Sequence, residues 1–530
     1  MSSPRSVNPS SAFWLARRAV LSPDREALVY WRGDGVAERW TYRRLDAAAR
    51  ALAAWMRRRG IRPGDRVAFL DLNDVRFAVT MFAAARLGAI FVPLNFRLSE
   101  AEIVDTLRDC DARLLVYGAA YGAARQAAER GCGCANYLLS SRDAGDEFAA
   151  AAAEPADVPL HDAGWDEPAW LLYTSGSTGR PKGVMLSHGN IFWNTINIVL
   201  IQGGFADDRV LISAPLFHAA PIATFMESFL RGALIHLEQS FDAERLLGRI
   251  AGEGIRVIAG VPAMYRLMAA HPAFDAADLS TLRAVIVGGA PVPEALIAQY
   301  RRRGVAVIQR YGLTEAAPLV TALPPGSPPD KQTTAGLPAL FGDLRLRGAG
   351  GGIAAPGEIG EIEACGPNIM QGYWNREAET REVLVDGWLR TGDLGRLDAD
   401  GYLTVVGRSK DMIISGGENV YAAEVEARLA ENPVVLESAV IGVPDEKWGE
   451  AVCAIVSLQP GRQATAEDVL AHLQGRLARY KQPKRVVFVP ALPKNGSGKI
   501  DKLQLRRTYG GGQAEGRPGA AALSEPADRA

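Results

Sequence analysis

The chain has 530 residues, which is more than one hydrophobic core normally holds, so we expect more than one domain. Apolar residues make up 48% of the chain and the formal net charge is −1. These values are typical of soluble globular proteins and exclude a broad basic face for nucleic acid. The five cysteines are scattered and no apolar leader precedes them, which favours a reduced, cytoplasmic setting.

Apolar runs in the chain are too short for a membrane span, which takes about 20 residues. The most apolar stretch lies at 78–92 and is interrupted by Arg86. Near the N-terminus, the basic pair Arg17 and Arg18 follows two aromatic residues, which allows a transient association with a membrane surface. The alternative is an ordinary amphipathic helix that packs against the main domain.

Strand-like and helix-like runs alternate through the first 340 residues. A strand is predicted over 66–73 and a helix over 77–88. Further strand-like runs stand at 89–95, 210–216, 233–238, 256–262, 283–291 and 305–315, with helical patterns at 243–254 and 293–304. This alternation indicates parallel βαβ units and an α/β class. The alanine-rich segment 148–159 has the composition of a surface linker.

The pattern changes after about residue 343. Short strands with Gly and Pro turns, at 343–348, 357–366 and 401–409, predict a small β-barrel-like subdomain. A compact α+β unit follows, with helices predicted over 422–433 and 465–480 and strands over 437–444, 451–458 and 485–490. We therefore predict a large α/β N-terminal domain over 1–408, a small α+β C-terminal domain over 409–509 and a disordered tail over 510–530.

The segment LLYTSGSTGRPKG, at 171–183, is too polar and too flexible for a core. It follows a strand-like run, its glycines let the backbone approach an anion closely, and Lys182 adds a charge that suits phosphate. It is not a Walker A loop, because Lys182 is followed by Gly183 rather than by Ser or Thr. Taken alone, the segment also fits a flexible surface loop.

Four further motifs follow in order: YGLTE at 311–315, TGD at 391–393, GRSKD at 407–411 and PKNGSGK at 493–499. Together with the glycine loop they resemble the adenylate-forming superfamily, which includes acyl-CoA ligases, adenylation domains of peptide synthetases and luciferases. The resemblance covers nearly the whole chain and is greatest to bacterial fatty-acyl-CoA ligases, through runs such as FVPLNFRLS, GGAPVPEALI and KDMIISGGENVYAAEVE. Any one motif is weak, whereas the set of five is specific.

The resemblance implies a reaction in two steps. A carboxylate attacks the α-phosphorus of ATP and releases pyrophosphate, and a thiol then displaces AMP from the acyl-AMP. Catalysis of such chemistry is mainly positioning and charge neutralisation. Thr314 would hydrogen-bond the α-phosphate, Glu315 would hold Mg²⁺, and Tyr311 with Gly312 would contact the adenine. The other side of the adenine would meet Gly288, Gly289 and Ala290, and the β- and γ-phosphates would lie against Thr174, Ser175, Gly176, Ser177, Thr178, Gly179 and Lys182.

The C-terminal domain of this family is mobile. By the resemblance, Asp393 would accept the ribose hydroxyls with support from Arg408. Lys499 would bind the acid and the α-phosphate during adenylation, and Lys410 would be the hinge about which the domain rotates for the second step. After the rotation, the CoA tunnel would meet Gly416 and Gly417.

The acid pocket is expected near His218, which would gate the pocket and the CoA tunnel, and near Ala316 and Trp193. A core histidine is the alternative for His218, and Trp193 fits a core position equally well. The segments 219–223 and 316–320 carry no charge, so they offer no partner for an ammonium or for a second carboxylate. This favours an apolar monocarboxylic acid, and the small residues favour a medium or long chain.

We therefore predict an ATP-dependent acid–CoA ligase that uses ATP, Mg²⁺ and CoA, binds no nucleic acid, and is a monomer or a homodimer. The alternatives are an aromatic acid–CoA ligase, a fatty acyl-AMP ligase that loads a carrier protein, and a non-catalytic member of the fold that binds an acyl group or a nucleotide. A non-catalytic member is expected to lack Lys499, Glu315 or Asp393, and all three are present.

Overall fold

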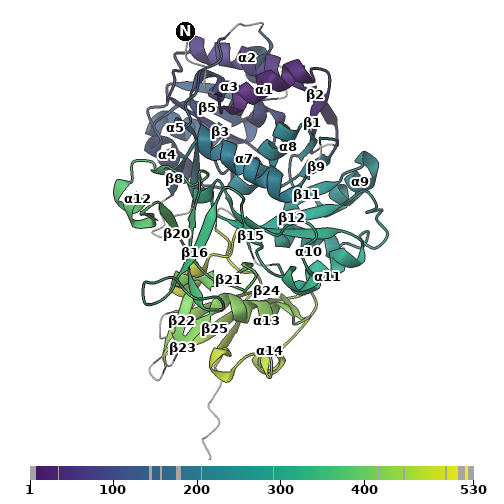
Figure 1. The fold of residues 1–530 in the computed structure, drawn as a ribbon, viewed down its shortest axis with the longest axis vertical. Coiled ribbons are helices and arrows are strands. Elements are labelled where there is room, and N and C mark those ends of the chain that lie inside the picture. The colour runs from purple at the N-terminus through teal and green to yellow at the C-terminus, as the bar shows by residue number, and fades with distance from the viewer. Residues whose placement is uncertain are drawn as a thin grey trace, which may run out of the picture. The chain divides into compact units, whose positions relative to one another are not determined.

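The computed structural model describes residues 7–33, 35–141, 146–154, 158–174, 181–204, 206–290, 292–415, 418–445, 448–495, 498–510 and 520–522. Figure 1 shows the ribbon. The chain divides into two compact units. The first consists of Met1–Val292, Leu296–Leu344 and Glu363–Arg390, and the second of Pro293–Ala295, Arg345–Ile362 and Thr391–Ala530.

The larger sheet of the first unit consists of β1 (Glu26–Trp31), β2 (Ala37–Thr41), β9 (Arg209–Ile212), β10 (Leu234–Glu238), β11 (Val257–Gly260), β12 (Ala284–Gly288), β13 (Ala306–Gly312), β14 (Leu319–Ala322) and β15 (Leu337–Pro338). Their order is β15-β14-β13-β12-β11-β9-β10-β1-β2. The strands from β13 to β1 run parallel, as the alternating pattern predicts, and antiparallel strands pair at both edges.

One face of this sheet packs against three helices, α9 (Ala243–Glu253), α10 (Pro262–Ala270) and α11 (Glu294–Arg302). The buried side chains between them include Tyr265, Phe274 and Tyr300. Asp242 caps α9 by accepting the N–H of Arg245 at 2.9 Å, and Gly254 ends it in the left-handed conformation.

The second sheet of the first unit consists of β3 (Arg66–Leu70), β4 (Ile90–Pro93), β5 (Ala112–Gly118), β6 (Asn136–Ser140), β7 (Pro168–Thr174), β8 (Lys182–Ser187) and β18 (Gly372–Tyr373). Their order is β18-β8-β7-β4-β3-β5-β6. The strands from β7 to β6 run parallel, and β8 and β18 join antiparallel. Because β7 pairs with β8, Thr174 lies opposite Lys182, and the two ends of the glycine loop lie side by side.

The remaining helices of the first unit are α1 (Ser11–Leu21), α2 (Tyr42–Arg58), α3 (Val75–Leu87), α4 (Glu100–Asp109), α5 (Gly122–Gly131), α6 (Glu147–Ala153), α7 (His188–Gln202), α8 (Ala219–Arg231) and α12 (Glu377–Val383), with short turns η1 (Ala119–Tyr121), η2 (Thr314–Ala316) and η3 (Pro329–Lys331). Helices α1, α2 and α3 pack on one another, and Figure 1 shows them grouped together. Helix α3 is buried along its whole length, because almost all of its residues are apolar.

The segment 148–159 is not the surface linker that its composition predicts. Its first half, 148–153, belongs to α6, which packs against α2. Phe148 and Ala151 are both 3% exposed, so an alanine-rich run with one phenylalanine is enough to bury one face of a short helix. Asp146 caps this helix by accepting the N–H of Ala149 at 3.1 Å.

The predicted change of pattern after residue 343 corresponds to a five-stranded sheet. It consists of β16 (Asp343–Arg347), β17 (Ile359–Cys365), β19 (Leu384–Val385), β20 (Trp388–Leu397) and β21 (Leu403–Arg408). The order is β16-β17-β20-β19, and β21 pairs with β20. Strands β19 and β21 both run antiparallel to β20.

The C-terminal part of the second unit is the predicted α+β structure. Its sheet consists of β22 (Met412–Ser415), β23 (Glu418–Tyr421), β24 (Val435–Asp445), β25 (Gly449–Leu458), β26 (Arg485–Phe488) and β27 (Ala520–Ala522), in the order β23-β22-β25-β26-β27 with β24 on β25. Helices α13 (Ala422–Ala430) and α14 (Ala466–Leu473) pack on it around Leu429 and Val469. Helix α15 (Lys502–Tyr509) contacts β24, and short turns η4 (Ser409–Asp411) and η5 (Arg479–Lys481) complete the unit.

Two details of this part differ from the sequence interpretation or lie outside it. The helix predicted over 465–480 ends at Leu473, because the chain turns at Gly475, which has a φ of +71°. The predicted disordered tail, 510–530, lies outside the described residues except for Gly510 and β27. Among the helices that the structure describes, none combines the length and the hydropathy of a membrane span.

Candidate active site

Three predicted site residues of the first unit lie where parallel strands end. His218 follows β9 and stands at the start of α8, Gly288 ends β12, and Gly312 ends β13. The carboxyl ends of parallel strands share one edge of a sheet, and ligands of open α/β sheets bind at that edge. Gly289 and Ala290 are exposed there, and Gly289 has a φ of +84°, which a side chain would strain.

Lys182, Tyr373 and Glu315 come together from three distant parts of the first unit. The Tyr373 hydroxyl donates a hydrogen bond to Glu315 Oε1 at 2.8 Å, and Lys182 Nζ lies 5.0 Å from the centre of the Tyr373 ring. Burial, and then the Glu315 carboxylate, raise the pKa of Tyr373, so its hydroxyl stays protonated and keeps donating. This Lys182–Tyr373–Glu315 group combines a positive charge, an oriented carboxylate and the end of the glycine loop.

Thr314 and Glu315 stand on η2, the short turn that follows β13. The N–H of Leu313 donates to the carbonyl of Pro318 at 3.1 Å, which folds the chain back on itself. This approach explains Gly312, because a Cβ there would lie 1.7 Å from the Pro318 carbonyl oxygen.

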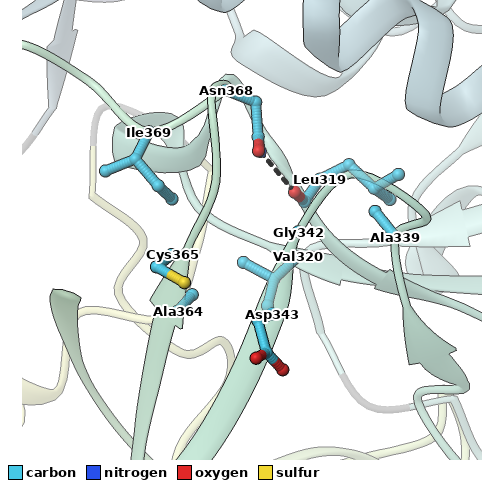
Figure 2. A pocket seen from close by; sticks show the side chains of 9 residues that line it. All are labelled: Leu319, Val320, Ala339, Gly342, Asp343, Ala364, Cys365, Asn368 and Ile369. Carbon is cyan, nitrogen blue, oxygen red and sulfur yellow. Dashed lines mark hydrogen bonds between the residues drawn. The ribbon is translucent and has the colours of Figure 1, made fainter. Parts of the chain in front are cut away.

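Asn368 holds this turn from behind. Its Nδ2 donates to the carbonyls of Ala316 at 2.7 Å and Leu319 at 2.8 Å, and Figure 2 shows the second of these bonds. The hollow beside Asn368 has a volume of about 10 Å³, so it holds one water at most and is not a ligand site. Ala316 itself is fully buried, so its side chain packs against the protein interior.

Asp109 fixes the stem of the glycine loop. Its carboxylate accepts the Tyr173 hydroxyl at 2.7 Å and pairs with Arg376 at 2.8 Å, which joins the end of β7 to the segment after β18. The predicted phosphate residues Ser175, Gly176, Ser177, Thr178 and Gly179 lie outside the described residues.

Asp393 and Arg408, the predicted ribose residues, lie together in the second unit. They face each other in the register of β20 and β21, and Arg408 Nε lies 3.1 Å from Asp393 Oδ1. Asp393 is 8% exposed, whereas about half of the Arg408 side chain is exposed. Thr391 Oγ1 accepts the N–H of Asp393 at 3.1 Å, which fixes the TGD turn.

The predicted hinge residue, Lys410, lies on η4 between β21 and β22. Burial, and then the neighbouring Arg408, lower the pKa of Lys410. Arg506 of α15 donates to the Lys410 carbonyl at 3.3 Å and pairs with Asp411 at 2.9 Å. These contacts tie the turn to the last helix of the same unit.

Lys499 lies in the second unit, at the end of a turn that two hydrogen bonds close. The side chain of Asn495 accepts the N–H of Lys499 at 3.1 Å, and the N–H of Asn495 donates to the Lys499 carbonyl at 2.8 Å. The Lys499 side chain is exposed. Gly416 and Gly417, which join β22 to β23, lie outside the described residues.

Trp193 and His218 differ in their surroundings. Trp193 lies in an aromatic cluster with Trp165, Phe192 and Phe341, with ring centres 5.0 to 6.2 Å apart, so its packing is explained without a ligand. His218 is half-buried and stands against the Phe217 ring at 4.2 Å, at the sheet edge described above.

Tyr373, Asn368 and Arg506 carry contacts that the motifs do not reveal. Tyr373 belongs to the run GYWN, which supports the family resemblance but says nothing of Glu315. The hydrogen bond between them spans 58 positions of sequence. A covariation signal between such positions would be needed to find the contact from sequences.

Comparisons with known proteins identify the family of the chain. The family model "AMP-binding enzyme" matches residues 15–374, and the model of its C-terminal domain matches 424–499. The chain is 45% identical to a feruloyl-CoA synthase of Amycolatopsis, over 95% of this chain and 100% of the relative. It is 38% identical to a long-chain-fatty-acid–CoA ligase of Mycobacterium tuberculosis, over 94% of this chain and 98% of the relative.

A solved structure with the same fold is the o-succinylbenzoate CoA synthetase of Bacillus subtilis in complex with its acyl-adenylate intermediate. The TM-score is 0.85 at 32% identity, over 96% of this chain and 98% of that one. The family models and the full-length relatives leave one conclusion: the chain belongs to the AMP-binding enzyme family, the ATP-binding adenylate-forming enzymes, and is an acid–thiol ligase of the AMP-forming class.

Proposed function

We propose that this ligase activates an apolar monocarboxylic acid with ATP and transfers the acyl group to CoA. In the first step a carboxylate oxygen attacks the α-phosphorus, and the bond to the β-phosphate oxygen breaks, which gives acyl-AMP and pyrophosphate. In the second step the CoA sulfur attacks the acyl carbon and AMP leaves, while the thiol proton passes to the medium. The Lys182–Tyr373–Glu315 group carries the proposal, because it provides charge for phosphates beside an oriented carboxylate.

The first-unit residues have distinct roles in this proposal. Lys182 and the glycine loop hold the β- and γ-phosphates, Thr314 donates to the α-phosphate, and Tyr311 packs on the adenine beside Gly288. Glu315 fits Mg²⁺, because its carboxylate oxygen is a hard ligand and Tyr373 fixes its orientation. Bound Mg²⁺ would neutralise phosphate charge and so make the α-phosphorus a better electrophile.

The second-unit residues bind the rest of the nucleotide and separate the two steps. Asp393 accepts the ribose hydroxyls, and the adjacent Arg408 guanidinium holds that carboxylate in place. Lys499 binds the acid and the α-phosphate in the first step. Rotation about Lys410 then removes Lys499 and brings Gly416 and Gly417 to CoA.

An aromatic acid is the first candidate substrate and a medium- or long-chain fatty acid the second. The relative at 45% identity is named for an aromatic acid, and the relative at 38% for fatty acids. The uncharged residues at 219–223 suit an aromatic ring or an alkyl chain. They offer no opposite charge for the ammonium of an amino acid or for the second carboxylate of a dicarboxylic acid.

The proposed function is tested by measuring pyrophosphate release with acids from acetate to oleate, with benzoate and with cinnamates, each in the presence and absence of CoA. We expect at least one aromatic or fatty acid to give CoA-dependent turnover, with one acyl-CoA and one AMP formed for each pyrophosphate. If no acid releases pyrophosphate although ATP binds, the non-catalytic alternative holds. Turnover that requires a carrier protein instead of CoA would support the acyl-AMP ligase alternative.

A further inference from the structure

A buried arginine stands next to the proposed acid site. Arg310 stands two residues before the end of β13 at Gly312, and it pairs in register with Gly288. Side chains alternate between the two faces of a strand. Val285, Val287 and Val307 belong to the core under α9–α11, so Arg310 lies on the opposite face of the sheet.

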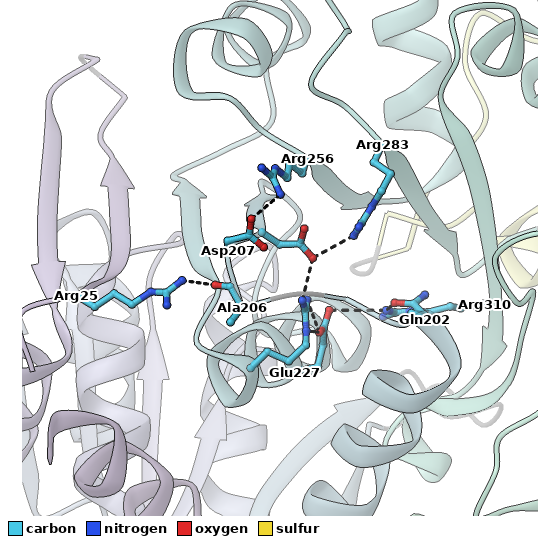
Figure 3. A network of polar contacts seen from close by, with 10 residues as sticks. Arg25, Gln202, Ala206, Asp207, Glu227, Arg256, Arg283 and Arg310 are labelled. Carbon is cyan, nitrogen blue, oxygen red and sulfur yellow. Dashed lines mark hydrogen bonds and ion pairs between the residues drawn. The ribbon is translucent and has the colours of Figure 1, made fainter. Parts of the chain in front are cut away.

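The guanidinium of Arg310 is held by residues of α7 and α8. It donates to Gln202 Oε1 and, at 3.3 Å, to Thr224 Oγ1, and it lies 3.9 Å from the Glu227 carboxylate. Figure 3 shows Arg310 and Gln202 beside Glu227. Glu227 also pairs with Arg231 at 2.8 Å. Burial lowers the pKa of Arg310 to about 10, so it remains charged at neutral pH.

Two donors in this group have no acceptor. Arg310 Nε and Gln202 Nε2 are both inaccessible to solvent and make no hydrogen bond within the part of the chain that the structure describes. A buried donor without an acceptor is unfavourable, and such atoms in native proteins call for a reason. A bound oxygen atom would provide one.

The Arg310 side chain is not fully enclosed on its side of the sheet. Its side chain keeps 11% of its surface accessible. The side chains that share its face, Ile286 and Ile308, keep 6% and 8%, whereas Val285 on the opposite face keeps none. Thr224 stands six residues after His218 on α8, which corresponds to about 9 Å along the helix. This length suits an aromatic acid better than a long alkyl chain.

We propose that Arg310 is a specificity-determining residue of the acid site, where it and Gln202 donate to a neutral oxygen, such as a phenol hydroxyl, at the far end of an aromatic acid. This inference depends on the ligase function proposed above. A neutral oxygen fits this place better than a carboxylate, because the Glu227 carboxylate already lies 3.9 Å from the Arg310 guanidinium and would repel a second buried negative charge.

The inference is tested by comparing 4-hydroxycinnamate with cinnamate in the pyrophosphate-release assay. We expect the wild type to prefer 4-hydroxycinnamate by about 10- to 100-fold in kcat/KM, which is the cost of leaving a buried donor without an acceptor. Arg310→Met should remove this preference by lowering only the value for 4-hydroxycinnamate, mainly through KM, and Arg310→Lys should restore part of it. Arg231 still pairs with Glu227 in these variants, which keeps that carboxylate balanced.

Arg283→Met is the matched control, because Arg283 belongs to the same network but pairs with Asp208 and is 44% exposed. It should leave the preference unchanged. If Arg310→Met does not fold, Gln202→Leu is measured instead and should lower the preference at least about threefold. The inference is overturned if the wild type shows no preference, or if the variant that folds affects both acids equally. Turnover of decanoate without turnover of either cinnamate overturns the inference about Arg310 but leaves the ligase function intact. If no acid releases pyrophosphate, the inference and the proposed function are both contradicted.

Discussion

Tyr373 is the residue on which the orientation of the Glu315 carboxylate depends. We predict that Tyr373→Phe raises the Mg²⁺ concentration for half-maximal pyrophosphate release about tenfold, the usual effect of losing a hydrogen bond to a metal ligand. The hydroxyl donates at 2.8 Å, and nothing else in the side chain changes. Initial rates over a range of Mg²⁺ at saturating ATP measure this effect.

Tyr300→Phe is the matched control for that variant. The Tyr300 hydroxyl donates to the Tyr265 carbonyl at 3.0 Å within the core under the larger sheet. Its loss should lower thermal stability and leave the Mg²⁺ dependence unchanged. An unaltered Mg²⁺ requirement in Tyr373→Phe would show that Glu315 does not hold the metal through this arrangement.

At the scale of single residues, the sequence predicts the residues proposed to bind the nucleotide better than it predicts the residues that hold them in place by hydrogen bonds. The sequence predicts that Asp393 and Arg408 lie together, because the family resemblance assigns both of their motifs to the same ribose. The contacts of Asn368 and Tyr373 could not be predicted in this way, since hydrogen bonds across 52 and 58 positions arise only when the sheets assemble. Arg310 falls within a predicted strand, and nothing in the local sequence indicates that its side chain contacts α7 and α8.

In the proposed mechanism, the turn η4 is the element about which the C-terminal part rotates. We predict that Lys410→Pro slows acyl transfer from acyl-AMP to CoA at least about tenfold and leaves acyl-AMP formation near the wild-type rate, because proline fixes φ at the hinge. The two steps are measured separately, the second from supplied acyl-AMP.

Lys410→Ala separates the loss of the side chain from the restriction of the backbone. It removes the charge that Arg408 and burial already disfavour, and it leaves φ unrestricted. We expect both of its half-reactions to continue near the wild-type rate. Normal acyl transfer in Lys410→Pro would place the hinge elsewhere.

At the scale of elements, a helix or strand is predicted correctly where its apolar residues recur with a clear helical or strand period. Helix α9 follows the predicted run closely, because its apolar pattern is long and ends at Gly254, whereas β9 and β11 have four residues each and are shorter than the predicted runs. The run at 148–159 reads as a linker because alanine is uninformative, and only packing against α2 shows that Phe148 is buried. The helix predicted to 480 ends earlier, since Gly475 permits a turn that local propensity does not require.

Two buried histidines make the stability of the whole molecule depend on pH. Burial lowers the pKa of His236 to about 3 and that of His188 to about 4, against 6.5 for an unburied histidine. Below pH 6.5, these two histidines therefore bind protons in the unfolded chain but stay neutral in the folded chain. The stability that the two neutral histidines contribute to the folded state is fully present well above pH 6.5. It is lost as the pH falls from 6.5 towards 4 for His188 and towards 3 for His236. From pH 6.5 to pH 5 each histidine should cost about 2 kcal/mol of unfolding free energy.

We predict that His236→Asn makes the urea midpoint less sensitive to pH between 7 and 5. The Trp31 indole donates to His236 Nδ1 at 3.2 Å, and an asparagine oxygen can replace that acceptor. Urea unfolding at pH 7 and pH 5 measures the change, and His271→Asn, at a partly buried histidine, is the control. An equal fall in midpoint for wild type and His236→Asn would contradict the assignment.

The central claim is that one chain catalyses two half-reactions and that Lys499 serves only the first. The most direct test is single-turnover measurement of Lys499→Ala with the best acid of the wild type. Acyl-AMP formation from acid and ATP should fall about 100-fold or more, because the positive charge at the α-phosphate is lost. Acyl-CoA formation from supplied acyl-AMP and CoA should stay within about threefold of the wild type. Equal losses in both half-reactions, or no loss in the first, would contradict the account.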